Sequence, residues 1–302
     1  MRTVSERADS ASRVMRRRRY LMCRPAHFTV EYSINPWMDP GVPTSGTTAL
    51  GQWKRLRDLL VHLGHEVGLI APLPGLPDMV FAANGAVAID GKALVARFRH
   101  PQRTGESAAY EKWFADDGWS EVRQATAVNE GEGDFLPAGG VLLAGSGFRS
   151  DPAARQEAAE FFGLPVLGLT LVDPRFYHLD TALAVLDDDE VMYYPGAFDA
   201  ESRELLAERY PDAILATEPD AEAFGLNAVS DGRHVLLASA AERLAGQLKE
   251  RGFEPIGVEL SELLKAGGGA KCCTLELRDG RIPPSTGARI RRVVPLPDSH
   301  AA

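Results

Sequence analysis

Two adjacent cysteines close to the C-terminal end are the residues best suited to covalent chemistry. Cys272 and Cys273 follow three consecutive glycines, residues 267–269, and a lysine, Lys271. Glycine adopts backbone angles that other residues avoid, and it lets a ligand approach the main chain closely. The neighbouring ammonium group is expected to lower the pKa of a thiol and so to favour its nucleophilic thiolate form. One cysteine is therefore predicted to be a nucleophile, and the other to point into the core as a small apolar side chain.

A histidine and four carboxylates supply the partners that such a nucleophile needs. His178 stands two residues before Asp180, and histidine titrates close to neutral pH, as a general acid or base must. Glu130, Glu132 and Asp134 alternate with glycines, so this segment is not a helix. Carboxylates of this kind match the N–H donors of a guanidinium group. The alternative interpretations without a catalytic role are that His178 is a hydrogen-bonded core residue and that residues 130–134 are a solvated acidic loop.

Further polar residues are candidates for holding the rest of a substrate. Four arginines lie at the far ends of the first two predicted hairpins, and one or two of them are expected to clamp a substrate carboxylate: Arg97, Arg99, Arg103 and Arg149. Asn35 and Asn227 are expected at the amino-acid end of the substrate. The histidines and cysteines lack the spacing of a zinc site, and the sequence has no glycine-rich phosphate-binding motif. We therefore expect neither a metal nor a cofactor.

The elements that must position these residues form a repeated unit, a strand hairpin followed by a helix. The unit recurs about five times, roughly every 40–50 residues, which is typical of radial repeats. Hairpins are predicted at 86–98, 135–144, 181–194 and 228–238, and helices at 107–117, 152–162, 200–210 and 241–251. The polar candidates stand just before the first strand of each hairpin: Asn84, the 130–134 cluster, His178 with Asp180, Asn227 and Cys272. In a closed ring these positions converge on one central cavity.

The two ends of the chain are expected to complete the fifth unit together. Residues 20–23 are typical of a short buried strand, 44–63 have helical spacing, and 67–71 are typical of a second strand. The glycine–cysteine segment opens the last hairpin, and the partner strand of that hairpin must come from residues 20–24. The first strand of the chain is therefore predicted to pair with the last.

The composition is that of a globular protein with an acidic body. The 302 residues are 45% hydrophobic and 25% charged, with a formal net charge of −9. The first 25 residues carry eight arginines against two acidic residues, and residues 1–18 are predicted to be a disordered basic tail. An acidic body disfavours nucleic acid as a partner and suits a small cationic molecule. No apolar run is long enough for a membrane span, and three cysteines are too few for a disulfide framework, so we expect a cytoplasmic protein.

Eight segments together make the chain resemble the guanidino-group modifying enzymes of the pentein superfamily. These segments are 22–25, 34–38, 77–84, 130–134, 147–150, 176–181, 192–195 and 271–274, and the resemblance spans about residues 20–277. The superfamily includes arginine deiminase, dimethylarginine dimethylaminohydrolase, the amidinotransferases and arginine dihydrolase. The resemblance implies an α/β fold, a five-bladed α/β propeller of ββαβ units around a central site. It also implies a single catalytic domain over residues 19–295, followed by a short tail at 296–302.

The resemblance implies roles for individual residues as well. The nucleophile of the family stands two positions before a threonine or serine, and Thr274 therefore selects Cys272 over Cys273. The catalytic histidine of the family opens a His-x-Asp motif, which corresponds to His178 with Asp180. These assignments imply a cysteine–histidine pair in which the aspartate holds the guanidinium group of the substrate.

Two positions depart from the pattern of the family. The acidic turn is one residue longer here, so either Glu130 or Glu132 holds the acidic role; Glu130 is favoured, with Asp134 supporting the turn. Asn84 stands where many deiminases have an aspartate, and the dihydrolase group has an asparagine there. The asparagine disfavours plain deiminase activity.

The implied reaction is hydrolysis of a guanidino C–N bond through a covalent cysteine thiouronium. Bacterial dimethylargininase-like proteins and arginine dihydrolase are the members that the chain resembles most. The favoured activity is dimethylargininase, which gives citrulline and dimethylamine; the alternative is arginine dihydrolase, which gives ornithine, ammonia and carbon dioxide. An amidinotransferase and a non-catalytic propeller that serves for binding are weaker alternatives. A small-molecule substrate is the expected partner, without nucleic acid or a membrane, and a homo-oligomer is left open.

Overall fold

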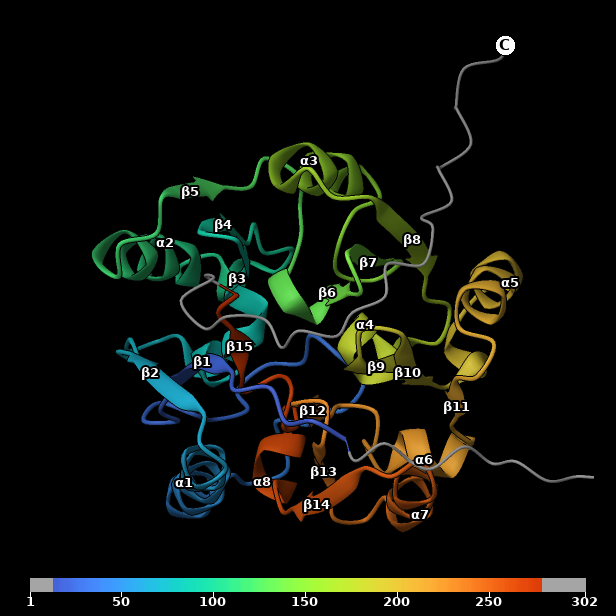
Figure 1. Ribbon diagram of the computed structural model, residues 1–302. Coiled ribbons are helices and arrows are strands. Elements are labelled where there is room, and N and C mark those ends of the chain that lie inside the picture. The colour runs from blue at the N-terminus through green and yellow to red at the C-terminus, as the bar shows by residue number, and fades with distance from the viewer. Residues whose placement is uncertain (1–12, 279–302) are drawn as a thin grey trace, which may run out of the picture.

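The computed structural model, which describes residues 13–278, is built from five small sheets arranged around one axis. Figure 1 looks along this axis, with the sheets near the centre and the longer helices on the outside. In every sheet the middle strand pairs antiparallel with one neighbour and parallel with the other. The five sheets are the five expected units, and the α/β propeller expected from the sequence is confirmed.

Four blades follow one another along the chain. The first has β3 (Ala86–Ile89), β4 (Lys92–Val95), α2 (Glu106–Asp116) and β5 (Glu121–Gln124). The second has β6 (Phe135–Ala138), β7 (Val141–Ser146), α3 (Ala153–Phe162) and β8 (Val166–Thr170). The third has β9 (Leu183–Asp187), β10 (Glu190–Tyr193), α5 (Ala200–Arg209) and β11 (Ile214–Leu215), and the fourth has β12 (Val229–Ser230), β13 (His234–Ala238), α7 (Glu242–Glu250) and β14 (Glu254–Val258). Short helices join the blades: α4 (Leu179–Ala182), α6 (Glu218–Glu222) and α8 (Ser261–Leu264).

The fifth blade closes the ring with both ends of the described chain. Its strands are β15 (Leu275–Glu276), β1 (Arg19–Cys23) and β2 (Glu66–Ile70), and its helix is α1 (Gly46–His62). The first strand of the chain lies in the middle of this sheet, with Tyr20 opposite Glu276. The predicted pairing of the first and last strands is therefore confirmed, and it places Cys272 at the entrance of the last inner strand.

Local sequence explains why these elements begin and end where they do. The side chain of Ser45 accepts a hydrogen bond from the backbone of Thr48 and so caps the first turn of α1. Gly64 follows the helix with φ +92°, a conformation that favours glycine. Asp90 and Gly91 both have positive φ in the turn between β3 and β4, as a tight two-residue hairpin requires.

The core lies mainly between each sheet and the helix that covers it. One side chain from each outer helix is almost fully buried against its sheet: Trp53, Phe114, Phe161, Leu206 and Leu248. In the first blade the inner strand β3 and the turn before it are rich in small residues, and alanines 82, 83, 86 and 88 are all inaccessible to solvent. Small side chains let neighbouring blades approach one another near the axis, where the candidate site residues lie.

The basic N-terminal segment differs in part from the expected tail. The backbone N–H of Arg16 donates to Asp231, and its guanidinium pairs with Asp187 at 2.9 Å. Arg18 pairs with Glu276 at 3.1 Å. Residues 13–18 are thus part of the folded unit, and disorder up to residue 18 was a wrong expectation for them. Residues 1–12, residues 279–295 of the expected catalytic domain and the expected tail at 296–302 lie outside the described residues.

Two further details differ from expectation. The outer strands β5 and β11 are short and lack clear apolar alternation, and the hairpin-and-helix pattern did not predict them. The two cysteines lie in a turn before β15 rather than in a strand: Cys273 donates its N–H to Gly269, and Thr274 donates to Lys271. Strand alternation therefore does not decide where their side chains point.

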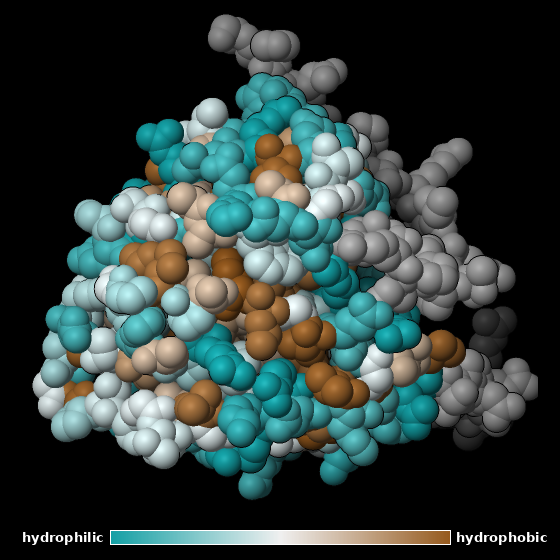
Figure 2. Space-filling view, turned by 90° about the vertical axis from the view of Figure 1, so that its left-hand side faces the viewer, coloured by the Kyte–Doolittle hydropathy of each residue, from teal (hydrophilic) through white to brown (hydrophobic). Residues whose placement is uncertain are grey.

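The surface of the described chain is mixed in polarity. Within residues 13–278, no helix is long and apolar enough to cross a membrane. Figure 2 shows the side of the molecule that carries α1 and β2, where a band of apolar residues at the middle is surrounded by polar ones. Val61 of α1 and Leu69 of β2 are among the exposed apolar side chains.

Candidate active site

The candidate site is built at one end of the five inner strands. Its residues stand in the short turns that precede β3, β6, β9, β12 and β15. Hydrogen bonds join neighbouring turns around the axis, and the N–H of Ala83 donates to the carbonyl of Cys272 at 3.0 Å. Residues far apart in the sequence therefore meet at one place because each blade contributes the same corner to the axis.

Cys272 lies in the tightest part of this arrangement, with only 2% of its surface exposed. Asn227 holds it from two directions, because its Nδ2 donates to Sγ at 3.1 Å and its Oδ1 accepts the N–H of Cys272 at 3.2 Å. The thiol donates to Asp180 Oδ2 at 3.3 Å. Asn227 thus contacts the sulfur itself. Gly269 makes room for this amide, since a Cβ there would lie 2.7 Å from Asn227 Oδ1.

The electrostatics of this pair favour the protonated thiol. Burial, followed by the charge of Asp180, raises the pKa of the Cys272 thiol well above its usual value. Burial also raises the pKa of Asp180 to about 7, against the opposing charge of Lys271. The expectation that Lys271 lowers the pKa of the thiol is therefore wrong. Its ammonium group donates instead to Glu132 at 2.7 Å and to the carbonyl of Thr274 at 3.1 Å.

His178 belongs to a buried chain of charges. Its Nε2 lies 2.9 Å from Glu130 Oε2, which also accepts from Arg149 at 2.6 Å. Burial opposes the charge on Glu130, but Arg149 and His178 outweigh it and hold the pKa of Glu130 well below its usual range. An ionised carboxylate only accepts hydrogen bonds, so Nε2 carries the proton in this contact. The other ring nitrogen, Nδ1, is buried and has no partner.

The three carboxylates of the 130–134 turn have three different surroundings. Glu130 faces His178, whereas Asp134 accepts from Ser150 at 2.6 Å and from the N–H of Leu179 at 3.0 Å. Burial raises the pKa of Asp134 to about 6. Glu132 turns to the other side, where Lys271 and Arg278 pair with it. This geometry favours Glu130 over Glu132 for the acidic role and fits Asp134 as a support for the turn.

The orientation of the Asn84 side chain follows from its neighbour. Arg103 NH1 donates to Asn84 Oδ1 at 2.7 Å, while Glu106 holds the rest of the same guanidinium group. Arginine cannot accept a hydrogen bond, so Asn84 must turn its oxygen towards Arg103. Its Nδ2 then points away, is buried, and has no partner. A Cβ on Gly133 would lie 2.4 Å from this nitrogen and 3.2 Å from the ring of His178. Asn84 therefore presents an N–H donor close to His178.

Asp78 is a member of this neighbourhood that sequence reasoning did not select. It is 3% exposed, and Tyr32 donates to its Oδ2 at 2.9 Å. Its Oδ1 has no partner, and burial raises its pKa. The available signal was a charged residue within an otherwise apolar segment, the turn Pro77–Val80. That turn was recognised as a family segment, but its carboxylate was not assigned a role.

Four buried polar atoms of this neighbourhood lack hydrogen-bond partners in the described part of the chain. Two are acceptors, Asp78 Oδ1 and Asp180 Oδ1; one is a donor, Asn84 Nδ2; and His178 Nδ1 acts as either. Buried polar groups are normally paired, because an unpaired one costs about 1–3 kcal/mol. Such a group of unpaired atoms around a cysteine indicates where a polar ligand binds.

Some expected substrate-binding residues have other surroundings. Arg97 is exposed and donates to the carbonyl of Thr126 at 2.7 Å, which does not favour a role in the site. Asn35 donates to Ala266 at 3.1 Å and accepts the N–H of Trp37, so it fastens a loop to the glycine segment. Arg149 also donates to the carbonyl of Ile34, which brings the same loop over the site. Among residues 13–278, no group of three or more His, Cys, Asp or Glu is arranged to hold a metal.

Comparison with known proteins agrees with this geometry. Residues 42–279 match the model of the eukaryotic N,N-dimethylarginine dimethylhydrolase family. The chain belongs to this family. It is 54% identical over 267 residues to an N(G),N(G)-dimethylarginine dimethylaminohydrolase of Mycobacterium tuberculosis, with 88% of each protein covered. It is also 38% identical over 272 residues to a bifunctional arginine dihydrolase/ornithine cyclodeaminase, ArgZ, of Synechocystis, of which it spans 38%.

Solved structures match the fold over most of the chain. The N-terminal domain of ArgZ, solved as a cysteine-to-serine variant bound to substrate, matches with a TM-score of 0.83 and 37% identity, covering 87% of this chain and 98% of that one. A dimethylarginine dimethylaminohydrolase adduct matches with a TM-score of 0.74 at 19% identity, covering 87% of this chain and all of that one, and supports the fold alone. The protein is thus a homologue of hydrolases that act on C–N bonds of linear amidines.

Proposed function

We propose that this protein hydrolyses dimethylarginine to citrulline and dimethylamine, with Cys272 as nucleophile. The observation that carries the proposal is the contact of the thiol with Asp180, a buried carboxyl that keeps one oxygen unpaired. A guanidinium group offers N–H donors in a fixed plane and matches such an oxygen. The Mycobacterium relative supports the choice of dimethylarginine over other guanidino compounds.

Substrate binding prepares the nucleophile. The unpaired oxygens of Asp180 and Asp78 accept N–H groups of the bound cation. The positive charge of the guanidinium offsets the burial and the nearby carboxylate that raise the pKa of the Cys272 thiol. The thiol proton passes to Asp180 Oδ2, with which it already shares a hydrogen bond. The amide of Asn227, which donates to Sγ, stabilises the thiolate.

The first half of the reaction releases the amine. The thiolate attacks the guanidinium carbon and forms a C–S bond, and the protonated imidazole of His178 gives a proton to the dimethylamino nitrogen. The C–N bond then breaks, dimethylamine leaves, and a thiouronium remains on Cys272. Glu130 stabilises the imidazolium, because it is an ionised carboxylate in contact with the ring at 2.9 Å.

The second half of the reaction hydrolyses the thiouronium. Neutral His178 removes a proton from water, the hydroxide adds to the same carbon, and the C–S bond breaks to give citrulline. The hydroxyl proton of the adduct leaves to solvent, and the thiolate recovers its proton from Asp180. The free Nδ2 of Asn84 supports this step, since an amide N–H stabilises the new oxygen, whereas a carboxylate would repel its lone pairs.

Asn84 also favours a second candidate function, arginine dihydrolase. Two successive hydrolyses convert arginine to ornithine, two ammonia and carbon dioxide, and the second requires the ureido oxygen of citrulline to be held. The unpaired Nδ2 of Asn84 is a donor of the kind that this oxygen needs. The ArgZ relative, a bifunctional arginine dihydrolase/ornithine cyclodeaminase, is similar at 38% identity.

A product assay separates the two candidates. The purified protein is incubated with asymmetric dimethylarginine and, separately, with arginine, and the products are identified by chromatography. Citrulline and dimethylamine from the first substrate, with slow turnover of arginine, support dimethylargininase. Ornithine and ammonia from arginine would instead show arginine dihydrolase activity. In that case Asn84→Asp should abolish turnover of citrulline. No turnover of any guanidino compound would overturn both.

We include a cytoplasmic location in the same proposal, because the proposed nucleophile is a thiol. Cys23, Cys272 and Cys273 are all free thiols in the structure. A cysteine nucleophile that must remain reduced is best suited to a reducing cytoplasm.

A further inference from the structure

A second cavity lies at the opposite end of the inner strands from Cys272. Its volume is about 400 Å³, within the size range of small-molecule sites, and all five blades contribute to its wall. Two neighbouring ion pairs separate it from the candidate active site: Glu132, which belongs to the acidic turn, is paired with Lys271 and with Arg278. Lys271 and Arg278 also line the cavity. This cavity is therefore distinct from the site around the cysteine.

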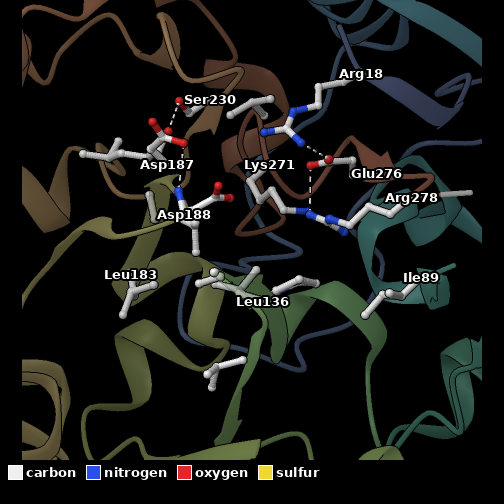
Figure 3. Close-up of a pocket in the computed structure, with 18 of the residues that line it drawn as sticks. Arg18, Ile89, Leu136, Leu183, Asp187, Asp188, Ser230, Lys271, Glu276 and Arg278 are labelled. Atoms are coloured by element: carbon white, nitrogen blue, oxygen red, sulfur yellow. Dashed lines mark hydrogen bonds and ion pairs between the residues drawn. The ribbon is translucent and has the colours of Figure 1, made fainter. Parts of the chain in front are cut away.

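One wall of the cavity carries a positive excess. In Figure 3, Arg18, Lys271, Glu276 and Arg278 gather on one side. Arg18, Lys271 and Arg278 form ion pairs with only two carboxylates, the buried Glu132 and the half-buried Glu276, so one positive charge is not compensated. Asp90 lies on the exposed rim, where solvent screens its charge.

The opposite wall carries a negative excess. Asp187 and Asp188 lie on that side in Figure 3, next to Ser230. Both carboxylates pair with a single cation, Arg16, at 2.9 and 2.7 Å. Leu183, Leu136 and Ile89 form an apolar side of the cavity that lies below both charged groups in Figure 3. The cavity thus presents a cationic end and an anionic end, with an apolar side that runs below both.

Two unpaired hydrogen-bond donors indicate which kind of ligand group binds at the cationic end. Tyr20 is 1% exposed and its hydroxyl has no hydrogen-bond partner, although it lines the cavity. The Nε of Arg18 is also buried and unpaired. Both groups donate, and buried donors normally have acceptors. A carboxylate is an acceptor that satisfies both donors and the positive excess together.

We propose that this cavity is a second binding site, for a basic α-amino acid such as arginine, ornithine or lysine. The carboxylate of the ligand accepts from Tyr20 and Arg18, its methylene stem lies over Leu136 and Leu183, and its distal cation faces Asp187 and Asp188. Lys271 lines the cavity and directly precedes Cys272 in the chain. A ligand in the cavity is therefore placed to influence the candidate active site. The proposal does not depend on the reaction catalysed at Cys272.

Calorimetry with the active site blocked tests the proposal. The protein is alkylated at Cys272 with a haloacetamidine, modification is checked by mass spectrometry, and L-arginine is titrated in. One bound arginine per chain is expected. Agmatine lacks the carboxylate and norvaline lacks the distal cation, so each should bind at least tenfold more weakly. A crystal of Cys272→Ser protein soaked in L-arginine locates the ligand directly.

Two matched substitutions make the result decisive. Tyr20→Phe removes only the unpaired hydroxyl and should weaken arginine binding about tenfold. Tyr210→Phe is the control, because Tyr210 is also buried with an unpaired hydroxyl but does not line the cavity. Equal binding by Tyr20→Phe and the native protein, absence of arginine from the cavity in the crystal, or no binding at millimolar arginine would each overturn the proposal.

Discussion

At the scale of single residues, the candidate site is defined by which polar atoms remain unpaired. Cys272, Asp180, His178 and Glu130 were all selected from the sequence, because a cysteine, a His-x-Asp motif and a glycine-rich acidic turn are unusual local patterns. Their mutual contacts in the structure give each one a definite chemical partner. The unpaired oxygen of Asp78 adds a position that no pattern had indicated.

The two cysteines give the sharpest test at this scale. Cys272→Ser should abolish turnover of dimethylarginine without lowering the melting temperature, because serine is far less nucleophilic than a thiolate. Cys273 is fully buried, and burial raises the pKa of its thiol well above its usual value, so that the thiol is a poor nucleophile. Cys273→Ser should therefore keep most activity. Steady-state kinetics on both variants measures the difference, and the reverse pattern would refute the assignment.

The buried charge of Asp180 should also be visible as a pH dependence of stability. Burial raises its folded pKa to about 7, whereas the unfolded pKa is about 3.9. The folded state is therefore progressively disfavoured as pH rises from about 4 to about 7. Asp180→Asn removes this cost, so its melting temperature relative to the native protein should be more favourable at pH 8 than at pH 4.5.

Asp231 provides a control of opposite sign for that measurement. Burial disfavours its charge, but His65 and His234 outweigh the burial and lower the pKa of Asp231 to about 2. Its contribution to stability is present above the unfolded pKa and is lost only as pH falls through about 2. Asp231→Asn should therefore lower the melting temperature at both pH values. A variant of Asp180 with the same pH profile as the Asp231 variant would contradict the assignment.

At the scale of elements, the turns before the inner strands depend on close packing that tolerates no extra atom. Gly133 is the clearest case, because a Cβ would lie 2.4 Å from Asn84 Nδ2 and 3.2 Å from the ring of His178. A side chain of any size must displace one of these two groups. The turn therefore fixes the position of the amide donor relative to the imidazole.

Gly133→Ala is predicted to reduce kcat/KM by about 100-fold, since displacements of about 1 Å cost activity of this order. Gly246 in α7 is a matched control, because a Cβ there meets nothing within 4 Å. Gly246→Ala should leave kinetics unchanged and stabilise the protein by about 0.5–1 kcal/mol. Kinetics and thermal melts of both variants test this, and native activity in Gly133→Ala would show that the turn is not critical.

The same scale shows where sequence reasoning succeeds and where it stops. Hairpins around tight turns such as Asp90–Gly91 and helices with an apolar face were predicted, because their signals are local. The short outer strands β5 and β11 were not, since their pairing depends on neighbours distant in the chain. Arg97 and Arg103 look equivalent in sequence, yet one is exposed and the other is 3% exposed beside Asn84. Burial of a charged side chain is decided by the assembled fold.

At the scale of the whole molecule, the basic N-terminal segment contacts three blades. Arg16 bonds to Asp231 and Asp187, and Arg18 pairs with Glu276. These contacts join β1 to its surroundings on the side away from the cysteine. Stability of the ring should therefore depend on residues 13–18.

A pair of truncations measures that contribution. Removal of residues 1–18 should lower the melting temperature by several degrees relative to removal of residues 1–12. The longer deletion removes the contacts of Arg16 and Arg18, and each kcal/mol lost corresponds to roughly 2–4 °C for a domain of this size. Thermal melts by circular dichroism compare the two. Equal melting temperatures would show that the segment contributes nothing to stability.

The pairing of β1 with β15 has a consequence for how the protein is made. One edge of β1 stays unpaired until β15 has been synthesised, because residues 19–23 occupy the middle of a sheet that residues 275–276 complete. The proposed nucleophile, Cys272, is synthesised just before β15. A nascent chain that stops before Cys272 therefore contains four blades and no catalytic centre, and one edge of β1 is open to wrong partners until residues 275–276 have been made. Activity appears only when the ring closes, and an incomplete chain is inactive however well its blades fold.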